Sequence, residues 1–118
     1  MPTRYYETTF ILKSVLSETE ATGIIDRFRN FLIAKGAEII REKAIGLRPM
    51  AYPIKAEDMG IYHRIEYKAR PEIRDAFIGI LNQEDRVLRY MSMILAKDRV
   101  DYDLSQSPSD LASQTETE

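Results

Sequence analysis

The stretch IYHRIEYKA, residues 61–69, alternates between two kinds of side chain along its whole length. One side of the stretch carries Ile, His, Ile, Tyr and Ala, and the other side carries Tyr, Arg, Glu and Lys. A period of two residues is typical of a β-strand in a sheet that covers one face and exposes the other. This strand therefore predicts a sheet with a single covered face.

Two amphipathic helices are predicted, one before and one after this strand. Pro71 suits the first turn of the later helix, where its missing N–H costs nothing. Ser17 and Glu20 form a capping box at the start of the earlier helix, and Gly36 ends it. The apolar stripes consist of Ala21, Ile24, Ile25, Phe28, Phe31 and Leu32 in the earlier helix and of Ile73, Ala76, Phe77, Ile80 and Leu81 in the later one. Both stripes are interpreted as core-facing.

Three more strands complete the predicted fold. They span residues 5–12, 38–46 and 87–95, and a turn at residues 57–60 precedes the strand described first. The core side of the first strand is expected to carry Tyr6, Thr8, Phe10 and Leu12. The order β-α-β-β-α-β is the ferredoxin-like arrangement of the α+β class, in which two helices cover one face of a four-stranded antiparallel sheet.

The last strand, residues 87–95, has no polar side. One side carries Leu88, Tyr90, Ser92 and Ile94, and the other carries Val87, Arg89, Met91, Met93 and Leu95. If the first set faces the helices, Arg89 lies beside Met91 and Met93 on the uncovered side. An exposed apolar strip of this kind indicates a binding surface.

The stretch GLRPMAYPI, residues 46–54, contains two prolines around a Met-Ala-Tyr centre. Each proline fixes its own φ and removes a backbone donor, so a regular central strand does not run through it. A bent strand or an edge strand is predicted here.

Charge divides the 118 residues into a domain and a tail. Residues 101–118 hold five of the 19 acids and none of the 17 bases, so residues 1–100 carry 17 bases against 14 acids, about +3. We expect residues 1–97 to form the domain and residues 98–118 to be an acidic, disordered tail. Such a tail opposes nonspecific phosphate binding by the domain, or serves solubility alone.

Several classes of function are excluded or disfavoured. The absence of cysteine excludes disulfides, thiolate metal sites and a cysteine nucleophile. His63, the only histidine, is interpreted as a core residue, and no carboxylates or glycines fall at the spacing of a metal or phosphate site. No apolar run is long enough for a membrane span, and no secretory signal is present. We therefore expect a cytoplasmic protein that is no enzyme and takes no metal, cofactor or small-molecule substrate.

Nucleic-acid binding fits the strands better. Tyr5, Tyr52 and Tyr62 are interleaved with basic residues, a mixture that pairs phosphate contact with base stacking. These basic residues are Arg4, Arg48, Lys55, Arg64, Lys68 and Arg89. For Arg64 and Lys68, a solvated strand face beside Glu66 is an equal alternative.

Three motifs in order carry a resemblance to a known family. They are Arg4-Tyr-Tyr-Glu near the start, the stretch 46–54, and Val87-Leu-Arg-Tyr at the last strand. Over residues 4–96 the chain resembles the bacterial ribosomal protein S6 family, the sixth protein of the small subunit. It departs from the family in Pro49, where Arg, Lys or Gln is usual, and in Ile45, which replaces a common Trp.

This resemblance implies a structural, non-enzymatic constituent of the small ribosomal subunit that takes part in translation. It implies binding to the central domain of 16S rRNA as a heterodimer with small-subunit ribosomal protein eighteen. The residues expected to contact rRNA are Arg4, Arg48, Lys55, Arg64 and Arg89. The expected protein-partner surface comprises Met50, Ala51, Tyr52, Pro53, Ile54, Met91 and Met93. The alternative from another class is a ferredoxin-like module that dimerises through its sheet, binds a small ligand or regulates a partner.

Overall fold

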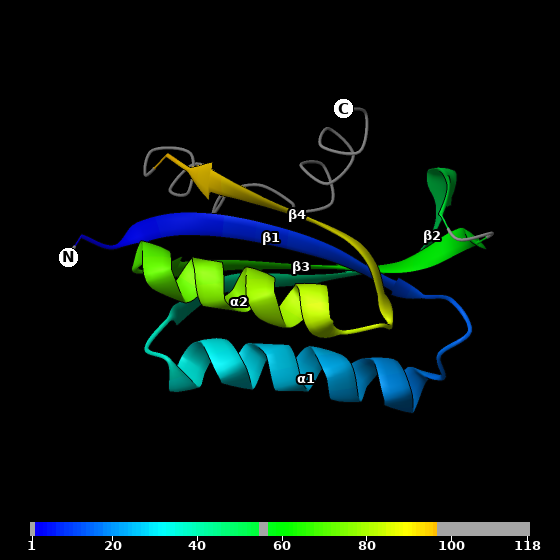
Figure 1. Cartoon of the computed structure of the whole chain (residues 1–118), viewed down its shortest axis with the longest axis horizontal. Helices are drawn as coiled ribbons and strands as arrows, with labels where there is room; N and C mark the ends of the chain where they lie inside the picture. The colour runs from blue at the N-terminus through cyan, green and yellow to red at the C-terminus, as the bar shows by residue number, and fades with distance from the viewer. Residues whose placement is uncertain (1, 55–56, 97–118) are drawn as a thin grey trace.

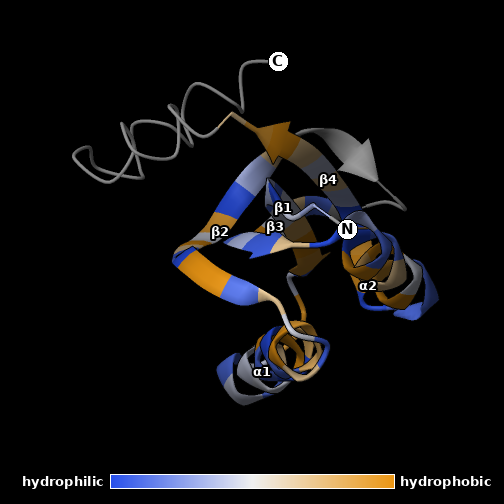
Figure 2. Ribbon diagram, turned by 90° about the vertical axis from the view of Figure 1, so that its left-hand side faces the viewer, coloured by the Kyte–Doolittle hydropathy of each residue, from blue (hydrophilic) through white to orange (hydrophobic). Residues whose placement is uncertain are grey.

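A computed structural model describes residues 2–54 and 57–96, without the side chains of residues 51–54 and 57. The elements are β1 (Arg4–Lys13), α1 (Glu18–Ala34), β2 (Glu38–Ile54), β3 (Glu57–Ala69), α2 (Pro71–Gln83) and β4 (Val87–Leu95). The strands form one antiparallel sheet in the order β2-β3-β1-β4, and both helices lie on the same side of it (Figures 1 and 2). The predicted ferredoxin-like α+β fold is confirmed. The predicted tail, residues 98–118, lies outside the described residues.

Helix α1 begins and ends where its local sequence dictates. The Ser17 hydroxyl accepts a hydrogen bond from the Glu20 amide at 3.1 Å, and the Glu20 carboxylate accepts one from the Ser17 amide at 2.8 Å. At the other end, Gly36 adopts a φ of 102°. The following amide, of Ala37, donates to the Leu32 carbonyl at 2.9 Å. The predicted capping box and glycine stop are both confirmed, because each depends only on neighbouring residues.

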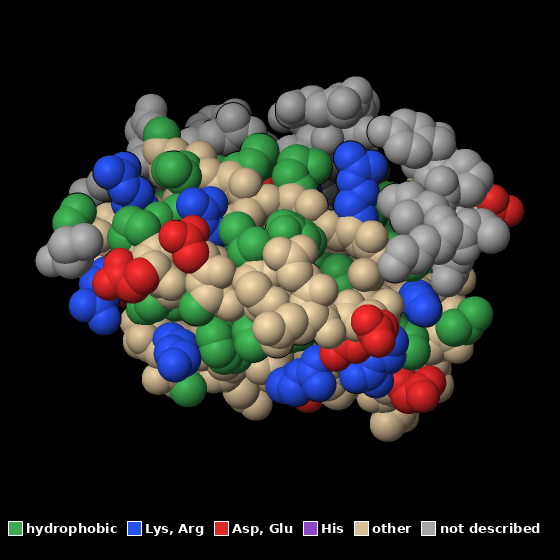
Figure 3. Space-filling model, viewed as in Figure 1, with side chains coloured by type: hydrophobic (Ala, Val, Ile, Leu, Met, Phe, Trp, Pro, Cys, Tyr) green, Lys and Arg blue, Asp and Glu red, His purple; other side chains and the backbone are tan. Residues whose placement is uncertain are grey.

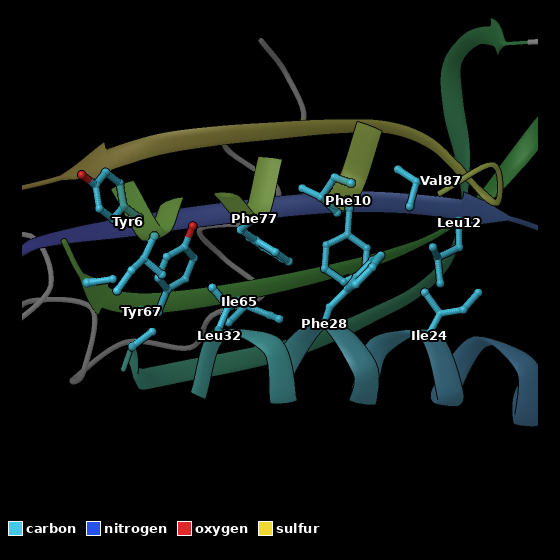
Figure 4. Close-up of a cluster of buried hydrophobic side chains, with 14 of the residues drawn as sticks. Tyr6, Phe10, Leu12, Ile24, Phe28, Leu32, Ile65, Tyr67, Phe77 and Val87 are labelled. Atoms are coloured by element: carbon cyan, nitrogen blue, oxygen red, sulfur yellow. The ribbon is translucent and has the colours of Figure 1, made fainter. Parts of the chain in front are cut away.

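The hydrophobic core fills the space between the helices and the sheet (Figure 4). Phe28 of α1 packs edge-on against Phe10 of β1 and Phe77 of α2, with ring centroids 5.2 Å and 5.7 Å away. The predicted core side of β1 is buried there, and so are most residues of both helical stripes, with Ile25, Phe31 and Ile80 partly buried against the core. Ala76 is the exception and is exposed, because the buried side of α2 centres on Ile73, Phe77 and Leu81.

Strand β2 lies at the edge of the sheet and is longer than predicted. It continues to Ile54, and β3 already begins at Glu57, so the predicted turn at residues 57–60 is wrong. The register of β2 against β3 shifts at three places, the last of them between Pro49 and Ile54. These irregularities let an edge strand contain two prolines, and its end bends away from the rest of the sheet (Figure 1). The edge position and the bend agree with the sequence prediction.

A bulge in β4 changes which of its side chains face the core. Ile11 of β1 is opposite Arg89, but the next residue, Leu12, is opposite Val87. Leu88 is therefore the extra residue, and Val87 joins the core cluster. The sequence grouping placed Val87 on the uncovered side, and this assignment is wrong because strict alternation does not hold across a bulge.

Candidate interaction surface

The candidate surface is the side of the sheet opposite the helices, which we call the open face. Directly opposed residues of antiparallel strands point to the same face, so the register assigns each side chain. The charged residues of the open face are Glu7 and Lys13 of β1, Glu38, Arg41, Lys43 and Arg48 of β2, Arg64, Glu66, Lys68 and, by alternation with Gly60, Asp58 of β3, and Arg89 of β4. Its large uncharged residues are Tyr5 and Ile11 of β1, Tyr62 of β3, and Met91, Met93 and Leu95 of β4.

Ion pairs join the strands at the middle of the open face. Arg64 donates from Nε to the Thr9 hydroxyl at 3.0 Å, and Nε lies 3.6 Å from the Glu7 carboxylate. Only 3% of Arg64 is exposed. Beside it, Arg41 of β2 donates to the Glu66 carboxylate from Nη2 at 2.6 Å and from Nε at 3.1 Å. These two arginines therefore neutralise carboxylates within the sheet.

The other arginines predicted to contact rRNA are exposed but lie far apart. Arg4 is opposite Ala69, a residue of the helix-side core, at one end of β3, whereas Arg48 lies on the open face opposite Gly60 towards the other end. At about 3.3 Å per residue, these two positions are roughly 30 Å apart. Arg89 lies on β4 opposite Ile11, at the far side of the sheet from β2. Lys55 lies outside the described residues.

The residues predicted to contact a protein partner fall on opposite edges of the sheet. Residues 50–54 belong to β2, whereas Met91 and Met93 belong to β4, and β3 and β1 lie between these strands. Met50 and Met93 are half-buried, and Met91 is 45% exposed. A partner that contacts both groups has to cross the whole sheet, about 14 Å at the usual strand spacing.

The sequence did not single out Ile11 and Leu95, two apolar side chains of the open face. Both are buried, yet neither belongs to the core cluster under the helices. Ile11 lies over Gly60, where a Cβ atom would come within 2.2 Å of its Cγ2 atom. The local pattern already places Ile11 opposite the core side of β1, but its contact with Gly60 depends on strand register.

Aromatic side chains lie beside cations on this face. The ammonium of Lys68 is 5.7 Å from the centre of the Tyr5 ring, and Tyr62 is half-buried near the other end of β3. A cation over an aromatic ring and a partly exposed ring are both suited to stacking against a base or packing against a partner.

On the other side of the sheet, His63 belongs to an ion cluster between α1 and β2. The Nε2 atom of His63 lies 2.6 Å from the Glu42 carboxylate, which also accepts two hydrogen bonds from Arg29 at 2.7 Å and 2.6 Å. Burial lowers the pKa of His63 below its usual value, and the hydrogen bonds from Arg29 lower the pKa of Glu42. A neutral His63 donates to Glu42, which confirms the interpretation as a core histidine.

The helix side of the molecule has mixed charge. In the view of Figure 3, basic and acidic side chains lie next to one another. Arg86 and Arg27 both pair with Glu84 and hold its pKa at about 2. Within residues 2–54 and 57–96, no group of three His, Asp or Glu side chains could hold a metal ion. The open face is thus the best candidate for binding a partner.

Comparison with known proteins identifies the family. The family model described as "Ribosomal protein S6" matches residues 5–93. This chain belongs to the ribosomal protein S6 family. A relative named small ribosomal subunit protein bS6 from Phocaeicola vulgatus is 37% identical over 97 residues, 82% of this chain and 85% of the relative. The protein of the same name from Flavobacterium johnsoniae is 36% identical over 98 residues, 83% of this chain and 87% of the relative.

The fold agrees with this assignment to the S6 family. A crystal structure of 30S ribosomal protein S6 from Thermotoga maritima superposes with a TM-score of 0.76 at 19% identity, covering 96% of this chain and 99% of that one. At this identity, the likeness concerns the fold alone. No helix within the described residues is long and apolar enough to cross a membrane.

Proposed function

We propose that this S6-family chain is a structural constituent of the small ribosomal subunit. It binds the central domain of 16S rRNA together with small-subunit ribosomal protein eighteen, on ribosomes in the cytoplasm. Membership of the S6 family supports the ribosomal role. The observation that carries the binding role is the open face, which combines arginine and lysine with methionine, isoleucine and tyrosine on one side of a rigid sheet.

The exposure of the side chains suggests how contacts are shared. Arg4, Arg48 and Arg89 are exposed, and with Lys55 they are our candidates for contacts to rRNA phosphates. Arg64 is the weakest candidate, because an RNA contact requires it to leave Glu7 and Thr9. The segment Met50–Ile54 and the Met91 and Met93 side chains are the proposed contacts to protein eighteen.

Charge predicts that the partner is needed for tight RNA binding. Residues 1–100 carry a net charge of only about +3. Each neutralised phosphate contributes to affinity through counterion release, so a domain with few surplus cations gains little alone. A heterodimer adds contact area to the same RNA site.

The test is binding to a central-domain 16S rRNA fragment across a salt series, with and without protein eighteen. We expect weak, salt-sensitive binding by this chain alone and cooperative binding when both proteins are present. Tight, salt-insensitive binding by the isolated chain would contradict the proposal. So would a homodimer of this chain that neither binds the fragment nor associates with protein eighteen.

A further inference from the structure

The open face has a surplus of positive charge. Its charged residues are seven cations and four carboxylates, a net charge of +3. Residues 1–96, with 15 bases and 13 acids, together carry only +2, so the surplus is concentrated on the side without helices. The ion pairs of Arg64 with Glu7 and of Arg41 with Glu66 are included in this count.

The same chain contains a segment of opposite charge. Residues 97–118 include two bases, Lys97 and Arg99, and six acids, five of which follow Arg99, so the segment carries a net charge of −4. Their apolar side chains include Tyr102, Leu104 and Leu111. The open face offers apolar surface at Met91, which is 45% exposed, and at Met93, which is half-buried.

Strand β4 ends on the open face. Leu95, the last residue of β4, is opposite Tyr5 and is buried outside the core cluster. The 22 residues from 97 to 118 can span up to about 70 Å when extended. The four strands are only about 14 Å across between their outer axes, so every position on the open face is within reach.

We propose that the acidic segment, residues 97–118, docks on the open face of its own chain and covers it until a partner displaces it. Attraction between its six acids and the surplus cations holds the cover, and its few apolar side chains lie against Met91 and Met93. Because the segment is tethered, its effective concentration near the face is on the order of millimolar, which suffices for a weak contact. Exposed charges are screened by salt, so the cover opens as ionic strength rises.

The absence of cysteine allows a direct test on the full chain. Ser107→Cys introduces a single thiol for a nitroxide label, and Met91 and Met93 supply methyl probes on the open face. We expect the label to broaden both methyl signals at low salt, while the amide signals of Thr22 and Asn30, exposed on α1, stay sharp. Equal broadening of both faces, or none at Met91 and Met93, would overturn the proposal.

The matched control keeps the nitroxide label and replaces the five acids after Arg99 with neutral amides. It combines Asp101→Asn, Asp103→Asn, Asp110→Asn, Glu116→Gln and Glu118→Gln. The broadening should be lost in this variant and in the parent at high salt. Broadening that persists unchanged in the neutral variant would overturn the electrostatic cover. A mixture of nitroxide-labelled chains and isotope-labelled chains without nitroxide tests for contact between molecules. Broadening of the Met91 and Met93 signals in this mixture would show that the segment of a second copy docks on the face, and it would overturn docking within one chain.

One consequence of the cover rests on the proposed ribosomal function. A cover that is about 90% populated weakens the apparent affinity for a competing partner roughly tenfold. The neutral-tail variant should therefore bind protein eighteen and the rRNA fragment up to about tenfold more tightly at low salt. Equal affinity would show that the cover does not compete, whereas no binding by either chain would overturn the proposed function and leave the nitroxide result intact.

Discussion

At the scale of single residues, Glu42 and Glu66, two carboxylates within the described sheet, are both paired with bases. Glu42 receives hydrogen bonds from Arg29 and His63 on the helix side, and Glu66 receives them from Arg41 on the open face. A buried charge is tolerated when its partner and its hydrogen bonds are both in place. The sequence supplied the residue types, but it could not show which acid pairs with which base.

His63 predicts a change of stability near pH 6. Burial lowers its pKa in the folded state below the ordinary histidine pKa of about 6.5. Between these two pKa values the unfolded chain binds a proton that the folded chain does not, so stability falls as the pH drops through this window. We expect the free energy of unfolding, measured with denaturant, to be lower at pH 5.5 than at pH 7.5.

His63→Gln is the control for this pH dependence, because it keeps a donor for Glu42 and does not titrate. Since His63 is the only histidine, the variant should lose most of the slope around pH 6. Glu42 also has a lowered pKa, but its loss of stability comes at more acidic pH. A wild-type protein with a flat or inverted profile between pH 7.5 and 5.5 would contradict the assignment.

At the scale of elements, helix boundaries follow from local sequence, whereas strand contacts do not. Ser17, Glu20 and Gly36 each act on groups within a few residues, and all three were predicted correctly. The start of β3 was misplaced because the Glu57-Asp58-Met59-Gly60 composition favours a turn. Pairing with β2 and β1 overrides this local preference.

The contact of Gly60 with Ile11 can be tested by adding one methyl group. A Cβ atom at Gly60 would come within 2.2 Å of Ile11 Cγ2, so Gly60→Ala should destabilise the fold by about 1–3 kcal/mol through overpacking. Gly79→Ala is the matched control, because a Cβ there meets nothing within 4 Å and lies inside a helix. It should stabilise the protein by roughly 0.5–1 kcal/mol. Thermal unfolding of both variants measures the difference, and equal shifts would refute the close packing.

At the scale of the whole molecule, the two-layer architecture separates stability from binding. The helices and one face of the sheet hold the aromatic core, and the opposite face carries the surplus cations and the apolar side chains of β4. Substitutions of exposed residues on the open face should therefore affect assembly more than folding.

Arg89→Ala tests this separation. Arg89 is exposed on β4, so its loss should lower the affinity for the rRNA fragment in the presence of protein eighteen and change the melting temperature little. Lys35→Ala removes the same charge from the exposed end of α1 on the helix side and should leave binding nearly unchanged. A large loss of thermal stability in Arg89→Ala would show that this side chain serves the fold instead.

The sequence by itself determined the element order, the helix limits, the core side of β1 and β3, and the family. All of these depend on spacing within a few residues or on short motifs, which a linear sequence displays. Tertiary structure alone decided the bulge that turns Val87 inward, the packing of Ile11 over Gly60, and the pairing of Arg64 with Glu7. Each of these joins residues from different strands, and strand register is set by the sum of contacts across the sheet rather than by any one segment.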